Sequence, residues 1–139
     1  MKTRLLLLAS LFATSLLFLS SCDPVDPEGT TEDRDKFVDS WTCTETNRKV
    51  PAYWVEISED PSLTNQVILK NFGQLGNSAL PNGSVSGDYI TVPQQYTLDD
   101  NSWQVEGDGV MVTNNSIDWN YELNDGTTLY QITAVYERN

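Results

Sequence analysis

Three glutamates lie in segments whose apolar and polar residues alternate as in β-strands. If two of them faced one cavity, they could act as the acid and the base that hydrolyse a glycoside. The three glutamates are Glu45, Glu56 and Glu106. A glycosidase needs two carboxyl groups that flank the bond at a set separation. No spacing brings any two of these residues together, so we expect all three on the solvated outer face of a sheet. The chain contains no histidine, which removes the commonest general base and any Ser-His or Cys-His pair. We therefore predict that the protein is not an enzyme.

Two loops rich in oxygen ligands, 99–101 (Asp-Asp-Asn) and 107–109 (Gly-Asp-Gly), are candidates for binding calcium. Calcium takes six to eight oxygens, and neither segment has the spacing of a calcium loop. Without histidine, a zinc site would have to use carboxylates and a thiol. We therefore predict no metal and no cofactor. We expect 99–101 to form a turn, and 107–109 to place a bulge or sharp bend in a strand.

Four tryptophans are the residues that we predict to contact a ligand: Trp41, Trp54, Trp103 and Trp119. The alternation of apolar residues puts Trp41, Trp103 and Trp119 on inward faces, where they could line a pocket for an apolar ligand, stack on sugar rings or simply pack the core. Trp54 falls opposite its apolar neighbours and is expected to point outward. Large exposed aromatic side chains often mark contact surfaces.

Cys43 alternates with Trp41 and is expected to face the core. A buried free cysteine usually behaves as a small hydrophobic residue. A reactive thiol needs a basic neighbour, and none is close in the sequence. We therefore predict that Cys43 is unreactive.

Eight runs of β-type sequence must position these side chains, after one helical turn at 36–39. Signals for tight hairpins lie at 87–88 (Gly-Asp) and 124–127 (Asn-Asp-Gly-Thr). Because closing a meander removes its unpaired edges, the pattern predicts an all-β fold, a small antiparallel up-and-down barrel. A two-sheet sandwich is the alternative. The predicted strands cover 41–48, 53–59, 66–72, 84–86, 89–93, 103–112, 117–123 and 129–137.

The N-terminus combines two basic residues, Lys2 and Arg4, with an apolar stretch at 5–19 and the sequence Leu-Ser-Ser-Cys at 19–22. The apolar stretch is short for a membrane-spanning helix and suits a secretory signal. Its end resembles the lipobox of bacterial lipoproteins. The resemblance implies that residues 1–21 are a signal peptide and that Cys22 is lipidated, anchoring the chain in a membrane. The alternative is an uncleaved anchor with an incidental cysteine.

The segment 22–35 is rich in proline and acidic residues and has a single aliphatic side chain, so we predict a disordered tether. Its acidic residues resemble the export signal of some surface lipoproteins of Bacteroidota, and both the periplasmic and the cell-surface face of the outer membrane remain open. The net charge is −12, and loss of the leader would leave 6 basic against 20 acidic residues. Such an acidic chain repels nucleic acid, which we exclude as a partner.

The segment 37–41 (Phe-Val-Asp-Ser-Trp) resembles the start of lipocalins, where a tryptophan plugs the closed end of the barrel, although Asp39 replaces the glycine of that family. The remaining pattern is similar to small lipocalin-like lipoproteins of Bacteroidota. The resemblance covers 36–139 and implies fold and location, with no known activity. The segments that carry this resemblance are 54–57, 67–72, 85–92, 105–109, 117–121 and 125–126.

Together these features predict a lipid-anchored lipoprotein of the bacterial outer membrane with one lipocalin-like barrel at 36–139. The first hypothesis for its function is non-catalytic binding of a small apolar or amphiphilic ligand at the open end of the barrel. The alternative is a structural or interaction module with a filled barrel, whose partner is an envelope protein or a glycan. A wide apolar interior would favour the first hypothesis. A packed interior with an exposed aromatic patch around Trp54 would favour the second.

Overall fold

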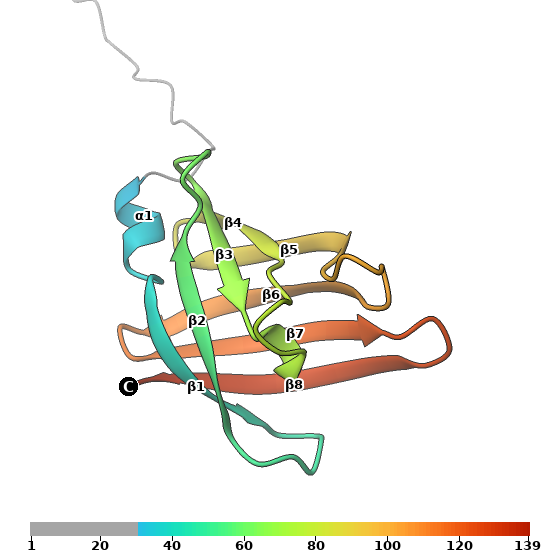
Figure 1. The fold of residues 1–139 in the computed structure, drawn as a ribbon. Coiled ribbons are helices and arrows are strands. Elements are labelled where there is room, and N and C mark those ends of the chain that lie inside the picture. Colours follow the sequence, from blue (N-terminus) through green and yellow to red (C-terminus); the bar gives the residue numbers. More distant parts are fainter. Residues whose placement is uncertain (1–30) are drawn as a thin grey trace, which may run out of the picture.

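A computed structural model describes residues 31–139, and all eight of its strands belong to one antiparallel barrel (Figure 1). No helix in this described part is long and apolar enough to cross a membrane. The elements are α1 (Thr31–Asp35), β1 (Asp39–Glu45), β2 (Tyr53–Glu59), β3 (Gln66–Lys70), η1 (Phe72–Gln74), β4 (Asn82–Ser86), β5 (Tyr89–Tyr96), β6 (Gln104–Thr113), β7 (Ser116–Asn124) and β8 (Leu129–Arg138).

The barrel is closed because β1 pairs with both of its neighbours. Thr42 lies opposite Trp54 on β2 and opposite Glu137 on β8. Strands β2 to β7 each pair with the strands before and after them in the chain, and β8 pairs with β7 and β1. The predicted all-β, up-and-down barrel of lipocalin-like type is therefore confirmed, and the sandwich alternative is wrong. Every strand of the described residues lies within 39–138, and the buried core of these residues extends from Phe37 to Tyr136.

Aromatic and aliphatic side chains together fill the interior of the barrel. Trp41, Phe72, Trp119 and Tyr136 are all fully buried. The ring centroid of Trp119 lies 5.5 Å from that of Phe72 and 5.3 Å from that of Tyr136. An eight-stranded barrel is just wide enough for side chains to fill. The inward orientations predicted for Trp41, Cys43 and Trp119 are confirmed.

The folded domain begins earlier than the predicted boundary at residue 36. Helix α1 forms from the last five residues of the expected tether, and Arg34 within it is buried. The Arg34 guanidinium lies 3.3 Å from the Glu59 carboxylate and donates to the backbone carbonyl of Leu63. Because polar contacts rather than apolar burial dock this helix, hydrophobic patterning could not reveal it. The predicted signal peptide, Cys22 and the tether up to residue 30 lie outside the described residues.

The predicted irregularity at 107–109 is wrong, because β6 runs through these residues without a break in pairing. The register shift lies in the facing strand, between Val92 and Gln95 of β5. That interval contains Pro93, which cannot donate a ladder hydrogen bond and favours bulges. Gly107 serves close packing instead, since a Cβ at this position would lie 2.3 Å from the Cβ of Tyr121.

Candidate functional site

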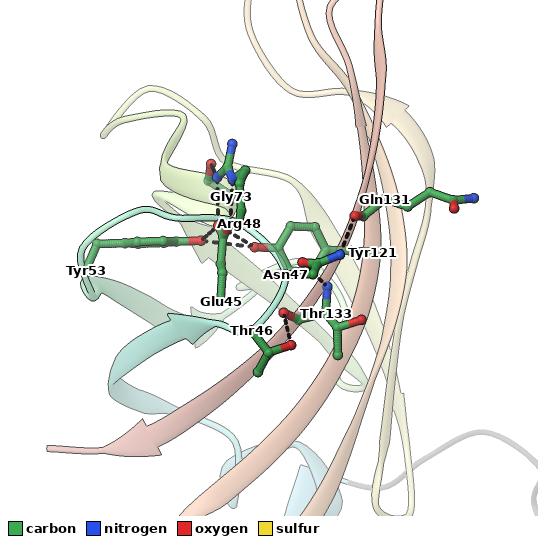
Figure 2. Close-up of polar contacts among 9 residues, drawn as sticks. All are labelled: Glu45, Thr46, Asn47, Arg48, Tyr53, Gly73, Tyr121, Gln131 and Thr133. Atoms are coloured by element: carbon green, nitrogen blue, oxygen red, sulfur yellow. Dashed lines mark hydrogen bonds and ion pairs between the residues drawn. The ribbon is translucent and has the colours of Figure 1, made fainter.

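A buried carboxylate occupies the barrel end at which β1 leaves for β2 (Figure 2). Glu45 was expected on the outer face, but its side chain is fully buried. It lies on the same face of β1 as Trp41 and Cys43, so strand alternation turns it inward. Its carboxylate accepts hydrogen bonds from the hydroxyls of Tyr53 at 2.7 Å and Tyr121 at 3.2 Å.

Arg48 closes this end of the barrel over the carboxylate. Its Nη2 donates to Glu45 Oε1 at 2.7 Å and its Nε donates to Oε2, so the ion pair is bidentate. The same Nη2 also reaches the backbone carbonyl of Gly73 at 3.4 Å. The guanidinium therefore ties the β1–β2 loop to the β3–β4 connection across the barrel end.

Burial keeps the tyrosine hydroxyls and the cysteine thiol around Glu45 in their neutral forms. Desolvation raises the pKa of Tyr53, Tyr121 and Tyr136 above their ordinary values, so these hydroxyls stay protonated. It also raises the pKa of the Cys43 thiol to about 11. A protonated, buried thiol is a poor nucleophile.

The three strand glutamates do not converge. Glu56 is exposed and lies 3.4 Å from the ammonium group of Lys70 on the outer face of β2 and β3. Glu106 lies on the outer face of β6, and its carboxylate has no hydrogen bond or ion pair with any described residue. The expectation of an outer-face position is thus confirmed for these two residues and wrong for Glu45.

A hollow of about 620 Å³ lies outside the barrel, against the outer face of β5 to β8. Its lining contains three carboxylates, which are those of Glu106, Asp108 and Glu122, and no lysine or arginine. Amide and hydroxyl side chains supply most of its other polar groups. These come from Asn47, Thr91, Gln94, Asn120, Gln131 and Thr133.

Two rows of side chains cross the strands within this hollow. In the first row, Asp108 lies opposite Thr91 on β5 and Asn120 on β7, and Asn120 lies opposite Thr133 on β8. The Thr91 hydroxyl donates to Asp108 Oδ1 at 2.8 Å, and the Thr133 hydroxyl donates to Asn120 Oδ1 at 3.2 Å. Neighbouring side chains thus hold these polar groups in place before any ligand arrives.

The second row places two carboxylates opposite each other. Glu106 on β6 pairs in register with Glu122 on β7, and Glu122 pairs with Gln131 on β8. The Gln131 amide donates to Glu122 Oε1 at 3.0 Å. Like charges directly opposite on a sheet are unfavourable. The hollow therefore contains a repulsive pair that a hydrogen-bond donor between the carboxylates would relieve.

The β1–β2 loop contributes to both sides of the barrel wall (Figure 2). Asn47 borders the hollow, where its Nδ2 donates to the Gln131 carbonyl at 2.8 Å and its Oδ1 accepts from the Thr133 amide at 3.1 Å. The next residue, Arg48, turns toward Glu45. Adjacent residues of one loop thus serve the buried cluster and the outer hollow.

The structure does not bring the four tryptophans together. Trp41 and Trp119 lie inside the barrel, and the Trp41 indole donates to the Phe37 carbonyl at 2.9 Å. Trp103, expected inward, is half-buried and packs against the edge of the core beside Tyr130, with the two ring centroids 6.1 Å apart. Trp54 points outward as expected and is 42% exposed. None of the four borders the outer hollow. Their role in ligand binding stays a prediction.

The loop at 99–101 forms a turn, in which the Asp100 carboxylate accepts from the Ser102 amide at 2.9 Å. Within residues 31–139, no group of three or more carboxylate or thiol side chains is positioned to hold a metal ion. Asp108 of the second oxygen-rich segment borders the hollow instead.

Sequence reasoning overlooked Arg48, the tyrosine hydroxyls and the polar outer face of β7 and β8. The sequence does contain a signal for Arg48. Glu45 lies on the same strand face as Trp41, which the alternation predicts to point inward, and an inward carboxylate requires a counter-ion. The outward residues Asn120 and Glu122 were also visible in the alternation of β7. Their meeting with β6 and β8 in one hollow depends on register, which the sequence pattern did not provide.

Comparisons with known proteins bear on the fold alone. No protein-family model and no curated protein matches the chain. A redesigned β-barrel, b11L5F_LGL, is similar with a TM-score of 0.54 at 11% identity, over 81% of this chain and 99% of that one. The structure of EF1p2_mFAP2b bound to DFHBI is similar with a TM-score of 0.50 at 12% identity, over 80% of this chain and all of that one. In fold, this chain is similar to these β-barrels.

Proposed function

We propose that this chain is a lipid-anchored, non-enzymatic binding protein of the bacterial envelope, and that it binds a small polar ligand in the hollow on the outer face of β5 to β8. The single observation that carries this proposal is the contrast between the two sides of the barrel wall. The interior is filled by buried aromatic and aliphatic side chains, whereas the outer face is hollowed over about 620 Å³. The proposal shares the filled barrel of the interaction-module alternative, whose partner was an envelope protein or a glycan at a patch around Trp54, but it places a small polar ligand in the hollow.

The chemistry of the hollow favours a polar ligand. Ligand sites commonly measure about 300–1,000 Å³ and are mostly apolar. This hollow falls within that range, but carboxylate, amide and hydroxyl groups dominate its lining. A ligand with many hydrogen-bonding groups would match it better than an apolar one. Catalysis is not part of the proposal, because the buried carboxylate of Glu45 is already held by Arg48 and two tyrosine hydroxyls.

A second candidate is binding of a small apolar or amphiphilic molecule inside the barrel. The observation in its favour is the similarity in fold to a barrel whose structure is bound to DFHBI. In this chain such a ligand would have to displace packed side chains such as Phe72 and Trp119. Opening the barrel end would also break the contacts of Arg48.

Binding is tested by NMR on residues 23–139, which include the whole described domain. Melting-temperature shifts against a library of polar and apolar metabolites would select ligands, and amide shifts would locate them. The proposal predicts ligands that move the amides of Gly107, Asn120 and Glu122. Ligands that instead move the indole signals of Trp41 and Trp119 would refute it in favour of the barrel interior.

Anchoring rests on the sequence at 19–22 and needs its own test. Cells expressing the full chain would be grown with radiolabelled palmitate, alongside a Cys22→Ala variant. The proposal predicts label in the wild-type protein and none in the variant. Equal labelling of both, or label in neither, would contradict lipidation at Cys22.

A further inference from the structure

We propose that the ligand of the outer hollow is a neutral carbohydrate. The inference rests on the proposed function, since it names the chemical class that this same hollow selects. It is carried by how hydrogen-bond donors and acceptors alternate across β6, β7 and β8, and by the sign of the charge around them.

The polar groups left free in the hollow alternate between acceptors and donors. Asp108 and Glu122 each use one carboxylate oxygen in a cross-strand hydrogen bond, which leaves the other oxygen free among the described contacts. Asn120 uses its Oδ1 with Thr133, which leaves its Nδ2 amide free to donate. Asn120 lies opposite Asp108 and two residues before Glu122 on the same face of β7. A donor therefore lies between two acceptors.

Hydroxyl groups suit this alternation because each one both donates and accepts. Two neighbouring hydroxyls of a sugar ring could donate to the Asp108 and Glu122 carboxylates while accepting from the Asn120 amide. A primary amine would satisfy the carboxylates but would leave the amide without an acceptor. A hydroxyl donor between Glu106 and Glu122 would also relieve the repulsion of that pair.

Charge then excludes acidic sugars. The lining contains three carboxylates and no basic side chain, within a chain of net charge −12. A uronic acid or a phosphorylated sugar would be repelled. The cross-strand hydrogen bonds already fix Asp108, Asn120 and Glu122, so little side-chain entropy would be lost on binding.

The test is an NMR titration of residues 23–139 with four neutral tetrasaccharides, which contain glucose, galactose, mannose or N-acetylglucosamine. Tetragalacturonate and spermine serve as the anionic and cationic probes, and DFHBI as the probe for the barrel interior. We expect at least one neutral tetrasaccharide to shift the amides of Gly107, Asn120, Glu122 and Gln131 saturably. We expect no shift of these amides with the other three probes.

Two variants of β7 sharpen the test. Asn120→Asp keeps the shape but replaces the free donor with an acceptor, and we expect it to weaken tetrasaccharide binding by at least about tenfold. Asn124→Asp is the matched control, since it adds the same charge on the same strand outside the hollow and retains the oxygen that accepts from the Gly126 amide. We expect it to leave affinity within about twofold. Urea unfolding would verify that both variants fold.

Three other outcomes would contradict the carbohydrate inference, and one of them would also contradict the proposed function. Binding of spermine or tetragalacturonate at the hollow, without any tetrasaccharide, would refute the carbohydrate and keep the proposed function. Tetrasaccharide binding that Asn120→Asp leaves unchanged would refute the role assigned to the amide donor and with it the inference. If DFHBI alone binds and moves the tryptophan indoles, both the inference and the proposed function fail.

Discussion

The Arg48→Met substitution tests whether the buried ion pair holds the barrel end together. Glu45 is fully buried, and Arg48 supplies two of the hydrogen bonds that its carboxylate accepts. Removing one partner of a buried ion pair costs about 3–5 kcal/mol, because the remaining charge stays buried without compensation. The Arg48 side chain is 31% exposed, so water can partly replace it. We therefore expect the free energy of unfolding to fall by about 3 kcal/mol, the lower end of that range.

A double substitution separates the ion pair from the packing. In Glu45→Leu/Arg48→Met both charges are gone, and the hydroxyls of Tyr53 and Tyr121, 3.0 Å apart, can still bond to each other. Replacing a buried ion pair with apolar side chains is often close to neutral. The double variant should therefore be more stable than Arg48→Met alone, by roughly 2 kcal/mol.

Urea unfolding of residues 23–139 at pH 7, followed by tryptophan fluorescence, would measure these differences. Lys70→Met is the matched control, because it breaks an exposed ion pair with Glu56 and should cost under about 1 kcal/mol. A loss below about 1 kcal/mol for Arg48→Met would refute the reasoning. So would a double variant that is less stable than Arg48→Met alone.

Three further predictions concern packing, reactivity and pH. Gly107→Ala should lower the free energy of unfolding by about 3 kcal/mol, measured by urea unfolding, because its Cβ would lie 2.3 Å from the Cβ of Tyr121 opposite on β7. A variant as stable as the wild-type protein would contradict this packing. Burial raises the pKa of the Cys43 thiol to about 11, so Cys43 should resist a thiol reagent at pH 7.5 until urea unfolds the chain. Rapid labelling of the folded protein would be inconsistent with this burial. The Ser40 amide and Arg138 hold the pKa of Asp39 below its ordinary value of 3.8. Because the folded pKa is the lower one, the stabilisation from Asp39 is complete above about pH 4 and is lost as pH falls through the folded pKa. Asp39→Asn should accordingly flatten the fall in stability over this range in acid unfolding curves, and an unchanged curve would count against the contact.

The fold was predictable because strand alternation and turn chemistry agree along the domain. Val55 and Ile57 on β2, and Ile117 and Trp119 on β7, alternate with polar residues, and this period of two fixes which face is buried. Closure of the barrel followed from the cost of leaving strand edges unpaired.

Two features could not be predicted by the same route. Helix α1 docks through Arg34 and Glu59, a contact between residues distant in sequence that no periodicity reveals. The Gly-Asp-Gly sequence at 107–109 predicts a bulge or sharp bend, because glycine weakens strands, whereas the missing side chain of Gly107 admits Tyr121 from the neighbouring strand.

The outer hollow was beyond sequence reasoning because it needs the register of four strands. Each of its polar residues alone is an ordinary outward side chain. Only the pairing of Glu106 with Glu122, and of Asp108 with Asn120, brings them into one site.

The central claim is that the barrel is filled and that binding takes place on its outer face. A crystal structure of residues 23–139 under xenon pressure tests the first half most directly, because xenon enters apolar cavities that are large enough to admit it. The account predicts no xenon inside the barrel. A xenon atom bound among Trp41, Phe72 and Trp119 would reveal an apolar cavity there and would contradict it.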